Sequence, residues 1–137
     1  MNPIVRNVIV VILGLIIGMT FNMGGIMGGM ALFPGPEGMT MDPDSMAKYM
    51  PQFSTINLIV PIVAHAIGTL AAAIFIGRMA ANNEKALCLI PGVVFLLGGI
   101  SMAMQLPAPM WMEVTDLIVA YIPMSILGYV IGTAGKN

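Results

Sequence analysis

The chain has 137 residues, with five basic and six acidic side chains and a formal net charge of −1. Hydrophobic residues make up 58% and charged residues 8%, and the mean hydropathy is +0.96. A soluble domain carries about 25% charged residues, so this composition excludes an ordinary water-facing domain. No basic patch is found, which argues against a nucleic-acid partner. Since Cys88 is the only cysteine, an internal disulfide and a cysteine-based zinc site are excluded.

Four uncharged stretches are each long enough to cross a bilayer as a helix, which takes about 20 apolar residues. They predict membrane-spanning helices over residues 4–30, 54–78, 86–104 and 113–133. We therefore expect an all-α fold, an integral membrane four-helix bundle, formed by residues 1–137 as a single transmembrane domain.

The positive charges predict how these spans are oriented. When the four spans alternate, one basic residue, Lys48, falls on one side of the membrane, and four fall on the other: Arg6, Arg78, Lys85 and Lys136. Lys and Arg concentrate in short cytoplasmic segments. We therefore expect both termini to be cytoplasmic.

The first connection, residues 34–52, is then the outer loop. Its Pro and Gly residues from Pro34 to Pro36 end the first helix. Asp42 followed by Pro43 predicts the start of a short helix, with Asp42 as its cap and Pro43 at its first position. This helix ends before Pro51, and we expect it to lie at the membrane interface.

Small residues at four-residue spacing mark the faces on which membrane helices pack closely. Three of the predicted helices carry such residues, and the sequence does not distinguish packing within the chain from contact with another subunit. The residues are Gly14, Gly18, Gly24, Gly25, Gly28 and Gly29 in the first helix, Ala64, Gly68 and Ala72 in the second, and Gly128 and Gly132 in the fourth.

Three prolines, Pro61, Pro91 and Pro123, lie within or near the last three spans. Membrane helices tolerate proline where neighbouring groups satisfy the freed carbonyls. The sequence agrees both with fixed kinks and with the hinges of a moving transporter, and it does not separate the two.

His65, the only histidine, lies about 12 residues into the second span, roughly 18 Å along the helix and near the midplane. An ionisable side chain at this depth indicates a functional site by default. It could relay protons, ligate a metal or haem, or bind a substrate. The alternative is a neutral imidazole hydrogen-bonded to a neighbouring helix, and Tyr121, at a similar depth in the fourth span, is the candidate partner.

Asn57 and Asp116 share a shallower level near the outer face, with Glu113 one turn above Asp116. If Asp116 is buried, Asn57 is a candidate partner. The simpler interpretation places both acids in the N-terminal turn of the fourth helix, where the helix dipole favours negative charge. If Asp116 instead faces the bundle, it and His65 form a proton-coupled pathway, about one and a half turns apart in depth.

The chain contains 15 methionines, and thioethers are soft ligands that select Cu(I). Six of them fall on the outer side: Met39, Met41, Met46, Met50, Met110 and Met112. Methionine is equally common in the first span, where packing explains it. A lone histidine without a second ligand at its depth indicates no metal site, so we expect no metal and no other cofactor.

Six short stretches follow one another along nearly the whole chain: FPGPEGM at 33–39, DPD at 42–44, AHAIGT at 64–69, FLLGGI at 95–100, LPAPMW at 106–111 and AYIPM at 120–124. Their order resembles that of a group of small uncharacterised bacterial membrane proteins with four transmembrane helices. The resemblance implies four spans and a multi-pass protein of the bacterial inner (plasma) membrane. It implies no particular activity.

No catalytic motif is present: the glycine pairs lack the lysine of a phosphate-binding loop, and no Ser-His-Asp or Cys-His set can be assembled. We therefore expect no enzymatic activity, and predict an accessory or structural subunit of a membrane complex, or a small homo-oligomer. Its partners would be the lipid bilayer and other membrane subunits or copies of itself. The alternative is a small transporter or channel with a pathway lined by His65, Tyr121, Asn57 and Asp116. A redox or metal protein using His65 or the outer methionines is a third hypothesis.

Overall fold

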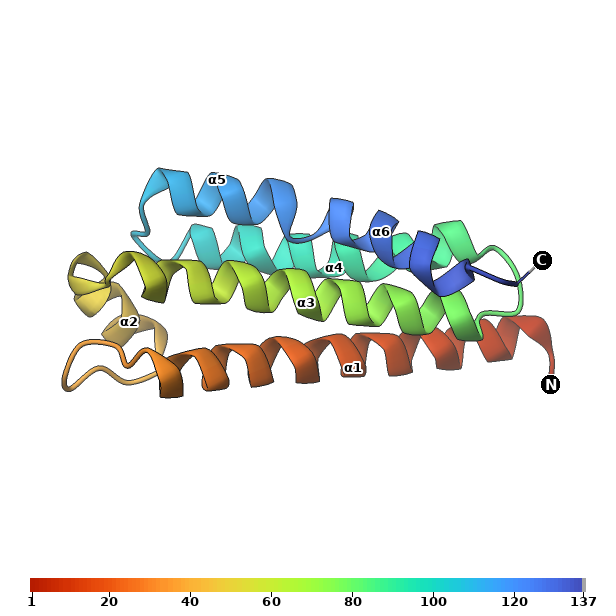
Figure 1. The fold of residues 1–137 in the computed structure, drawn as a ribbon, viewed down its shortest axis with the longest axis horizontal. Coiled ribbons are helices and arrows are strands. Elements are labelled where there is room, and N and C mark those ends of the chain that lie inside the picture. Colours follow the sequence, from red (N-terminus) through yellow and green to blue (C-terminus); the bar gives the residue numbers. More distant parts are fainter. Residues whose placement is uncertain (137) are drawn as a thin grey trace.

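A computed structural model describes residues 1–136, which form helices and connecting turns without any strand. Four helical segments are long and apolar enough to cross a membrane: Pro3–Leu32, Thr55–Met79, Glu84–Ala103 and Met110–Thr133. They lie side by side along the long axis of the molecule (Figure 1). The all-helical bundle predicted from the sequence is confirmed, and each helix end lies within three residues of its predicted position.

Polar caps explain where the helices begin. The side chain of Asn2 accepts a hydrogen bond from the Ile4 amide at the start of α1 (Pro3–Leu32). Ser54 and Asn57 form a capping box at the start of α3 (Thr55–Met79), each satisfying a backbone amide of the other. These caps satisfy the amides that have no partner inside the helix.

The outer loop contains α2 (Pro43–Tyr49), followed by the 3-10 turn η1 (Met50–Gln52). Asp42 caps α2 by accepting a hydrogen bond from the Ser45 amide, and Pro43 occupies the first turn. The helix therefore begins as the Asp-Pro pair predicts, because proline needs no amide partner at that position.

The fourth predicted span is present but is interrupted near Pro123, where the sequence left a fixed kink and a hinge open. It consists of α5 (Met110–Val119) and α6 (Ile122–Thr133), separated at Ala120 and Tyr121. Pro123 lacks the amide that would bond to the carbonyl of Val119, which favours a break at this place. In contrast, α3 continues through Pro61, and α4 (Glu84–Ala103) continues through Pro91.

Close packing between α1 and α3 depends on four glycines. A Cβ atom built at Gly14 would lie 2.6 Å from Cγ1 of Ile76, and one at Gly18 would lie 2.9 Å from the carbonyl oxygen of Gly68. Two further glycines, Gly25 and Gly29, meet α3 in the same way, at Ala64 and Val60. The packing expected at these four glycines, and at Ala64, Gly68 and Ala72 opposite them, is confirmed.

Gly24 and Gly28 do not take part in this packing within the chain, whereas the sequence left open contact within the chain or with another subunit. A Cβ atom at either position would meet no atom within 4 Å. Each lies next in sequence to a glycine that packs on α3, so it points about 100° away around the helix. A residue at that angle belongs to a different face of α1.

The last helix packs on the opposite side of α3. A Cβ atom at Gly128 would lie 2.5 Å from Cβ of Ala73, and one at Gly132 would lie 2.6 Å from the carbonyl oxygen of Ile74. The expected packing role of Gly128 and Gly132 is therefore confirmed, and α3 is the central helix, with α1 on one side and α4 and α6 on the other (Figure 1).

Both termini and the turn between α3 and α4 lie at one end of the bundle, and α2 lies at the other (Figure 1). Basic side chains at the first end bond to carbonyls at the end of α3: Nε of Arg6 donates to Met79, and Nζ of Lys136 donates to Gly77 and Ala80. Lys136 also pairs with Glu84 at 3.0 Å. Cations at a helix C-terminus are favourable, since the last carbonyls carry partial negative charge.

Candidate functional site

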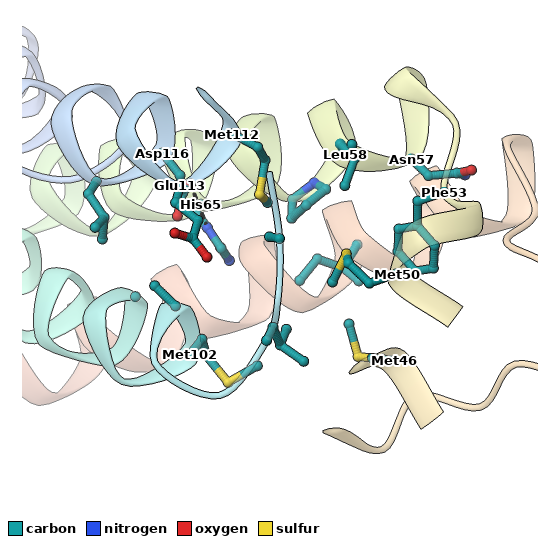
Figure 2. A pocket seen from close by; sticks show the side chains of 17 residues that line it. Met46, Met50, Phe53, Asn57, Leu58, His65, Met102, Met112, Glu113 and Asp116 are labelled. Carbon is teal, nitrogen blue, oxygen red and sulfur yellow. Dashed lines mark hydrogen bonds and ion pairs between the residues drawn. The ribbon is translucent and has the colours of Figure 1, made fainter. Parts of the chain in front are cut away.

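A cavity of about 140 Å³ lies at the α2 end of the bundle. Its walls are mostly apolar and come from η1, α3, α4 and α5, with Ile26 of α1 and Met46 of α2 also lining it (Figure 2). Three titratable side chains line it: His65 at its inner end, Asp116 beside His65, and Glu113 one turn along α5. Apolar walls around a few convergent polar groups are typical of a ligand site.

The polar groups at the inner end form a closed hydrogen-bonded cluster. Nδ1 of His65 lies 2.8 Å from Oδ1 of Asp116 and 2.9 Å from the hydroxyl oxygen of Tyr121. The Tyr121 hydroxyl donates to Oδ2 of Asp116 at 2.8 Å. The rings of His65 and Tyr121 also stack, with centroids 5.7 Å apart. We call these three side chains the polar cluster.

The hydrogen bonds assign a proton position to His65. Because the Tyr121 hydroxyl donates its proton to Asp116, its oxygen can only accept from His65. When Asp116 is ionised, a proton on Nδ1 of His65 can be donated to both the Asp116 carboxylate and the Tyr121 hydroxyl oxygen. In the neutral imidazole Nε2 is then an acceptor, and among residues 1–136 no group is hydrogen-bonded to it. His65 therefore keeps one ring nitrogen free for a ligand or a proton.

The helix break carries Tyr121 into the cluster. Tyr121 has φ −115° and ψ −81°, outside helical geometry, and begins α6 as its N-cap residue. Its side chain is buried, with 2% exposure. Gly99 of α4 lies against it, and a Cβ atom at Gly99 would come 2.8 Å from Cζ of the ring. The break and the missing side chain at Gly99 together bring the hydroxyl to His65 and Asp116.

A second hollow of about 330 Å³ adjoins the cluster, and His65 and Tyr121 line it as well. Its other walls come from α1 and α4, where Met19 and Val94 are exposed. Asn22 of α1 lines it too, and its Oδ1 is buried without a hydrogen-bond partner among residues 1–136. His65 thus lines both the cavity and the second hollow.

This geometry agrees with two of the alternatives that the sequence left open. Tyr121 is a hydrogen-bond partner of His65, and Asp116 faces the bundle together with His65. The depth difference of one and a half turns does not separate them, since the side chains of adjacent helices reach toward each other. Asp116 is only 7% exposed.

Two other expectations are wrong. Asn57 is not the partner of Asp116: its side-chain amide donates to the carbonyl of Phe33 at 2.7 Å, and its oxygen accepts from Ser54. Nor does Asp116 lie in the first helical turn, because α5 begins three residues earlier than predicted, at Met110. Only Glu113 lies in that turn, so the helix-dipole interpretation applies to Glu113 alone.

The outer methionines do not gather in one place. Met46, Met50 and Met112 line the cavity together with Met102 (Figure 2), whereas Met41 and Met110 are exposed. Among residues 1–136 no three His, Cys, Asp or Glu side chains are grouped so that they could hold a metal ion. Copper binding by the outer methionines stays a third hypothesis, which this arrangement does not test.

Comparison with protein-family models, curated proteins and solved structures finds no match for this chain. The resemblance to small bacterial four-span proteins therefore stays a prediction. The site has to be interpreted from its own geometry.

Sequence reasoning missed several residues that shape the site, above all Gly99 and Asn22. Gly92 and Gly99 are seven residues apart, which places them two turns apart on one face of α4. Both lie against the region of the helix break, Gly92 at Ser125 and Gly99 at Tyr121. This seven-residue spacing is the signal that could have indicated the face of α4 that receives Tyr121.

Proposed function

We propose that this protein is a small multi-pass membrane transporter that binds its substrate in the cavity and exchanges a proton at the polar cluster. The observation that carries the proposal is the hydrogen bonding of His65 to both Asp116 and Tyr121 at the inner end of the cavity. Ionisable side chains are costly among apolar helices, and in membrane proteins they mark substrate and proton pathways.

The interrupted fourth span supports the proposal. Secondary transporters commonly build their substrate sites where a membrane helix is discontinuous, because the break leaves backbone groups and helix ends available inside the membrane. Here the break at Ala120 and Tyr121 adjoins the cluster.

The charge distribution supports an orientation for this transporter. Four of the five basic residues lie at the end that carries both termini, and we propose that this end is cytoplasmic. The cavity lies at the opposite end and would open to the outside. The inner membrane of a bacterium is the proposed location, on the resemblance described above.

The polar cluster is the reason to prefer transport to an accessory or structural role. Packing faces suffice for a structural subunit, and replacing a buried ion pair by apolar side chains of similar volume is often neutral or stabilising. A buried titratable cluster beside a cavity therefore indicates a functional site rather than a structural contact. Transport requires binding and proton exchange but no covalent chemistry, so the proposed role is not enzymatic.

Reconstitution of the purified chain alone tests this function. Proteoliposomes on a solid-supported membrane are exposed to inorganic cations, organic ammonium ions, carboxylates and sugars, with and without a pH gradient. At least one class is expected to evoke a current that His65→Ala abolishes. Thr20→Ala is the control, since the Thr20 hydroxyl bonds only to Ile16 of its own helix, and it should behave as the wild type.

The accessory-subunit hypothesis predicts a different outcome. No compound class would then evoke a current, and native mass spectrometry of the gently solubilised membrane would show the chain in a stable complex with other subunits. That pair of results would rule out transport by this chain alone.

A further inference from the structure

We infer that the cavity binds a small organic cation with an apolar body, namely an ammonium group attached to one aromatic ring. The inference deepens the proposed function, because the bound compound would be the transported one. It begins from the charges that line the cavity. Among its lining residues two are carboxylic acids, Glu113 and Asp116, one is His65, and none is Lys or Arg.

Within the described part of the chain, Glu113 has no partner of opposite charge. It is partly buried at the cavity wall, and among residues 1–136 no side chain is hydrogen-bonded or ion-paired to its carboxylate. Asp116, in contrast, accepts from both His65 and Tyr121. The lining therefore carries one uncompensated carboxylate even when His65 is protonated, and two carboxylates when it is neutral. A cation is the ligand that complements this charge.

The hydrogen-bonding groups also require a donor. With Nδ1–H of His65 directed to Asp116, its Nε2 is an acceptor in the neutral ring. In the adjoining hollow the buried Oδ1 of Asn22 is an acceptor without a donor. The carboxylates are acceptors as well. An ammonium group supplies several donors at once, whereas an anion would leave these acceptors unpaired, which is costly when they are buried.

The apolar walls indicate an organic cation rather than a metal ion. Hard cations such as Ca²⁺ take six to eight oxygen ligands, and the carboxylates of Glu113 and Asp116 provide four oxygens, of which both on Asp116 already accept hydrogen bonds. The remaining walls are mainly hydrocarbon and thioether, the latter from Met46, Met50 and Met112 among others. Thioethers make favourable contacts with aromatic rings.

The volume limits the size of the ligand. The cavity has about 140 Å³, and an apolar cavity of about 150 Å³ holds one benzene molecule. One ring therefore fills this volume, and a short ammonium arm would extend beyond it at the polar cluster, where the second hollow shares His65 with the cavity. The ring would lie among the methionines and Leu58, and the ammonium would lie toward Glu113 and the polar cluster.

Three compounds that share a phenyl ring and differ in charge test the inference: 2-phenylethylammonium, 2-phenylethanol and 3-phenylpropanoate. Binding to the full chain in detergent is measured by calorimetry and by the nitrogen NMR signals of the imidazole, which are unambiguous because His65 is the only histidine. The dissociation constant of the ammonium compound is expected to be at least tenfold lower than that of the alcohol, and the carboxylate should not move the signals.

Glu113→Gln is expected to reduce the preference for the ammonium compound several-fold and to leave alcohol binding unchanged. Asp44→Asn is the matched control, because Asp44 is an exposed acid of α2 that does not line the cavity. Ala103→Phe places a ring in the cavity and should abolish binding of all three compounds. Thermal unfolding of each variant establishes that it is folded.

Three results would overturn the inference: equal affinity for the ammonium compound and the alcohol, tighter binding of the carboxylate, or an unchanged preference in folded Glu113→Gln. The test is independent of transport. Selective cation binding without any current contradicts the proposed function only, whereas a His65-dependent current evoked by carboxylates or sugars, without cation binding, contradicts this inference only.

Discussion

Tyr121 lies directly against Gly99, and this contact positions the hydroxyl on which the polar cluster depends. A Cβ atom at Gly99 would lie 2.5 Å from the hydroxyl oxygen of Tyr121 and 2.8 Å from Cζ. Neither distance is compatible with a real side chain, so Tyr121 reaches His65 and Asp116 only because residue 99 has no side chain. At the neighbouring residue, Gly98, a Cβ atom would meet no atom within 4 Å.

Gly99→Ala is therefore expected to displace Tyr121 and to destabilise the protein. Inserting a methyl group into a packed site costs about 1–3 kcal/mol, which should lower the midpoint of thermal unfolding in detergent. Gly98→Ala is the control, and it should match or exceed wild-type stability, since alanine is favoured over glycine in a helix by about 1 kcal/mol. Equal midpoints for the two variants would contradict the contact.

Tyr121→Phe separates the hydroxyl from the ring. The stacking on His65 should survive, but Asp116 loses a donor at 2.8 Å, and an unpaired buried acceptor costs about 1–3 kcal/mol. The imidazole nitrogen signals of His65 should shift as well, since its Nδ1 loses one of two neighbours. Tyr129→Phe is the control, because the Tyr129 hydroxyl has no hydrogen-bond partner among residues 1–136, and it should leave both readouts unchanged.

Adjacent glycines of α1 test the packing on α3. Gly29→Ala should destabilise the bundle, because its Cβ would overlap both γ carbons of Val60, a β-branched side chain with little freedom to move. Gly28→Ala meets no atom within 4 Å and should be neutral or slightly stabilising in thermal unfolding of the monomer. A larger loss for Gly28→Ala than for Gly29→Ala would show that the rotation of α1 differs from the one described.

The start of α2 is expected to depend on pH. The Thr40 hydroxyl, and then the Ser45 amide, hold the pKa of Asp42 below its ordinary value of 3.8, since both stabilise the ionised carboxylate. The stabilisation is therefore complete above the unfolded-state pKa and is lost as the pH falls through the lower folded-state value. Hydrogen exchange at the Ser45 amide, corrected for its intrinsic pH dependence, should show the loss only in that acidic range.

Thr40→Val removes the hydroxyl donor and should shift the loss of protection at Ser45 to higher pH. If protection were independent of pH in the wild type, or if Thr40→Val had no effect on its midpoint, the Asp42 cap would not be the group that titrates.

The proposed orientation is tested with single cysteines. Cys88 is buried, and Cys88→Ala provides a background without thiols. Met41→Cys, in the outer loop, should react with a membrane-impermeant maleimide added to intact cells, whereas Ala81→Cys, in the turn between α3 and α4, should react only after the membrane is opened. Both positions are exposed in the structure. The reverse pattern would place both termini outside.

The ends of the helices could be predicted from the sequence because local groups determine them. Asp42 and Pro43 begin α2 through one side-chain hydrogen bond and one fixed dihedral angle. The four long apolar segments follow from composition alone. The choice between Gly24 or Gly28 and Gly25 or Gly29 as the packing face of α1 could not be predicted, since both pairs have the same spacing, and only the rotation of α1 against α3 distinguishes them.

The candidate site also combines features that could be predicted from the sequence with features that could not. The depth of His65 and the similar depth of Tyr121 follow from counting residues along two helices at a constant rise, and the sequence by itself determined both. Only the tertiary structure decided that Asp116 joins them and Asn57 does not. Which neighbour a helical side chain meets depends on how its helix is rotated against the others. Here α5 begins at Met110, so Asp116 lies beyond the first turn, and the helix breaks before Pro123, and neither feature can be obtained from hydrophobicity along the chain.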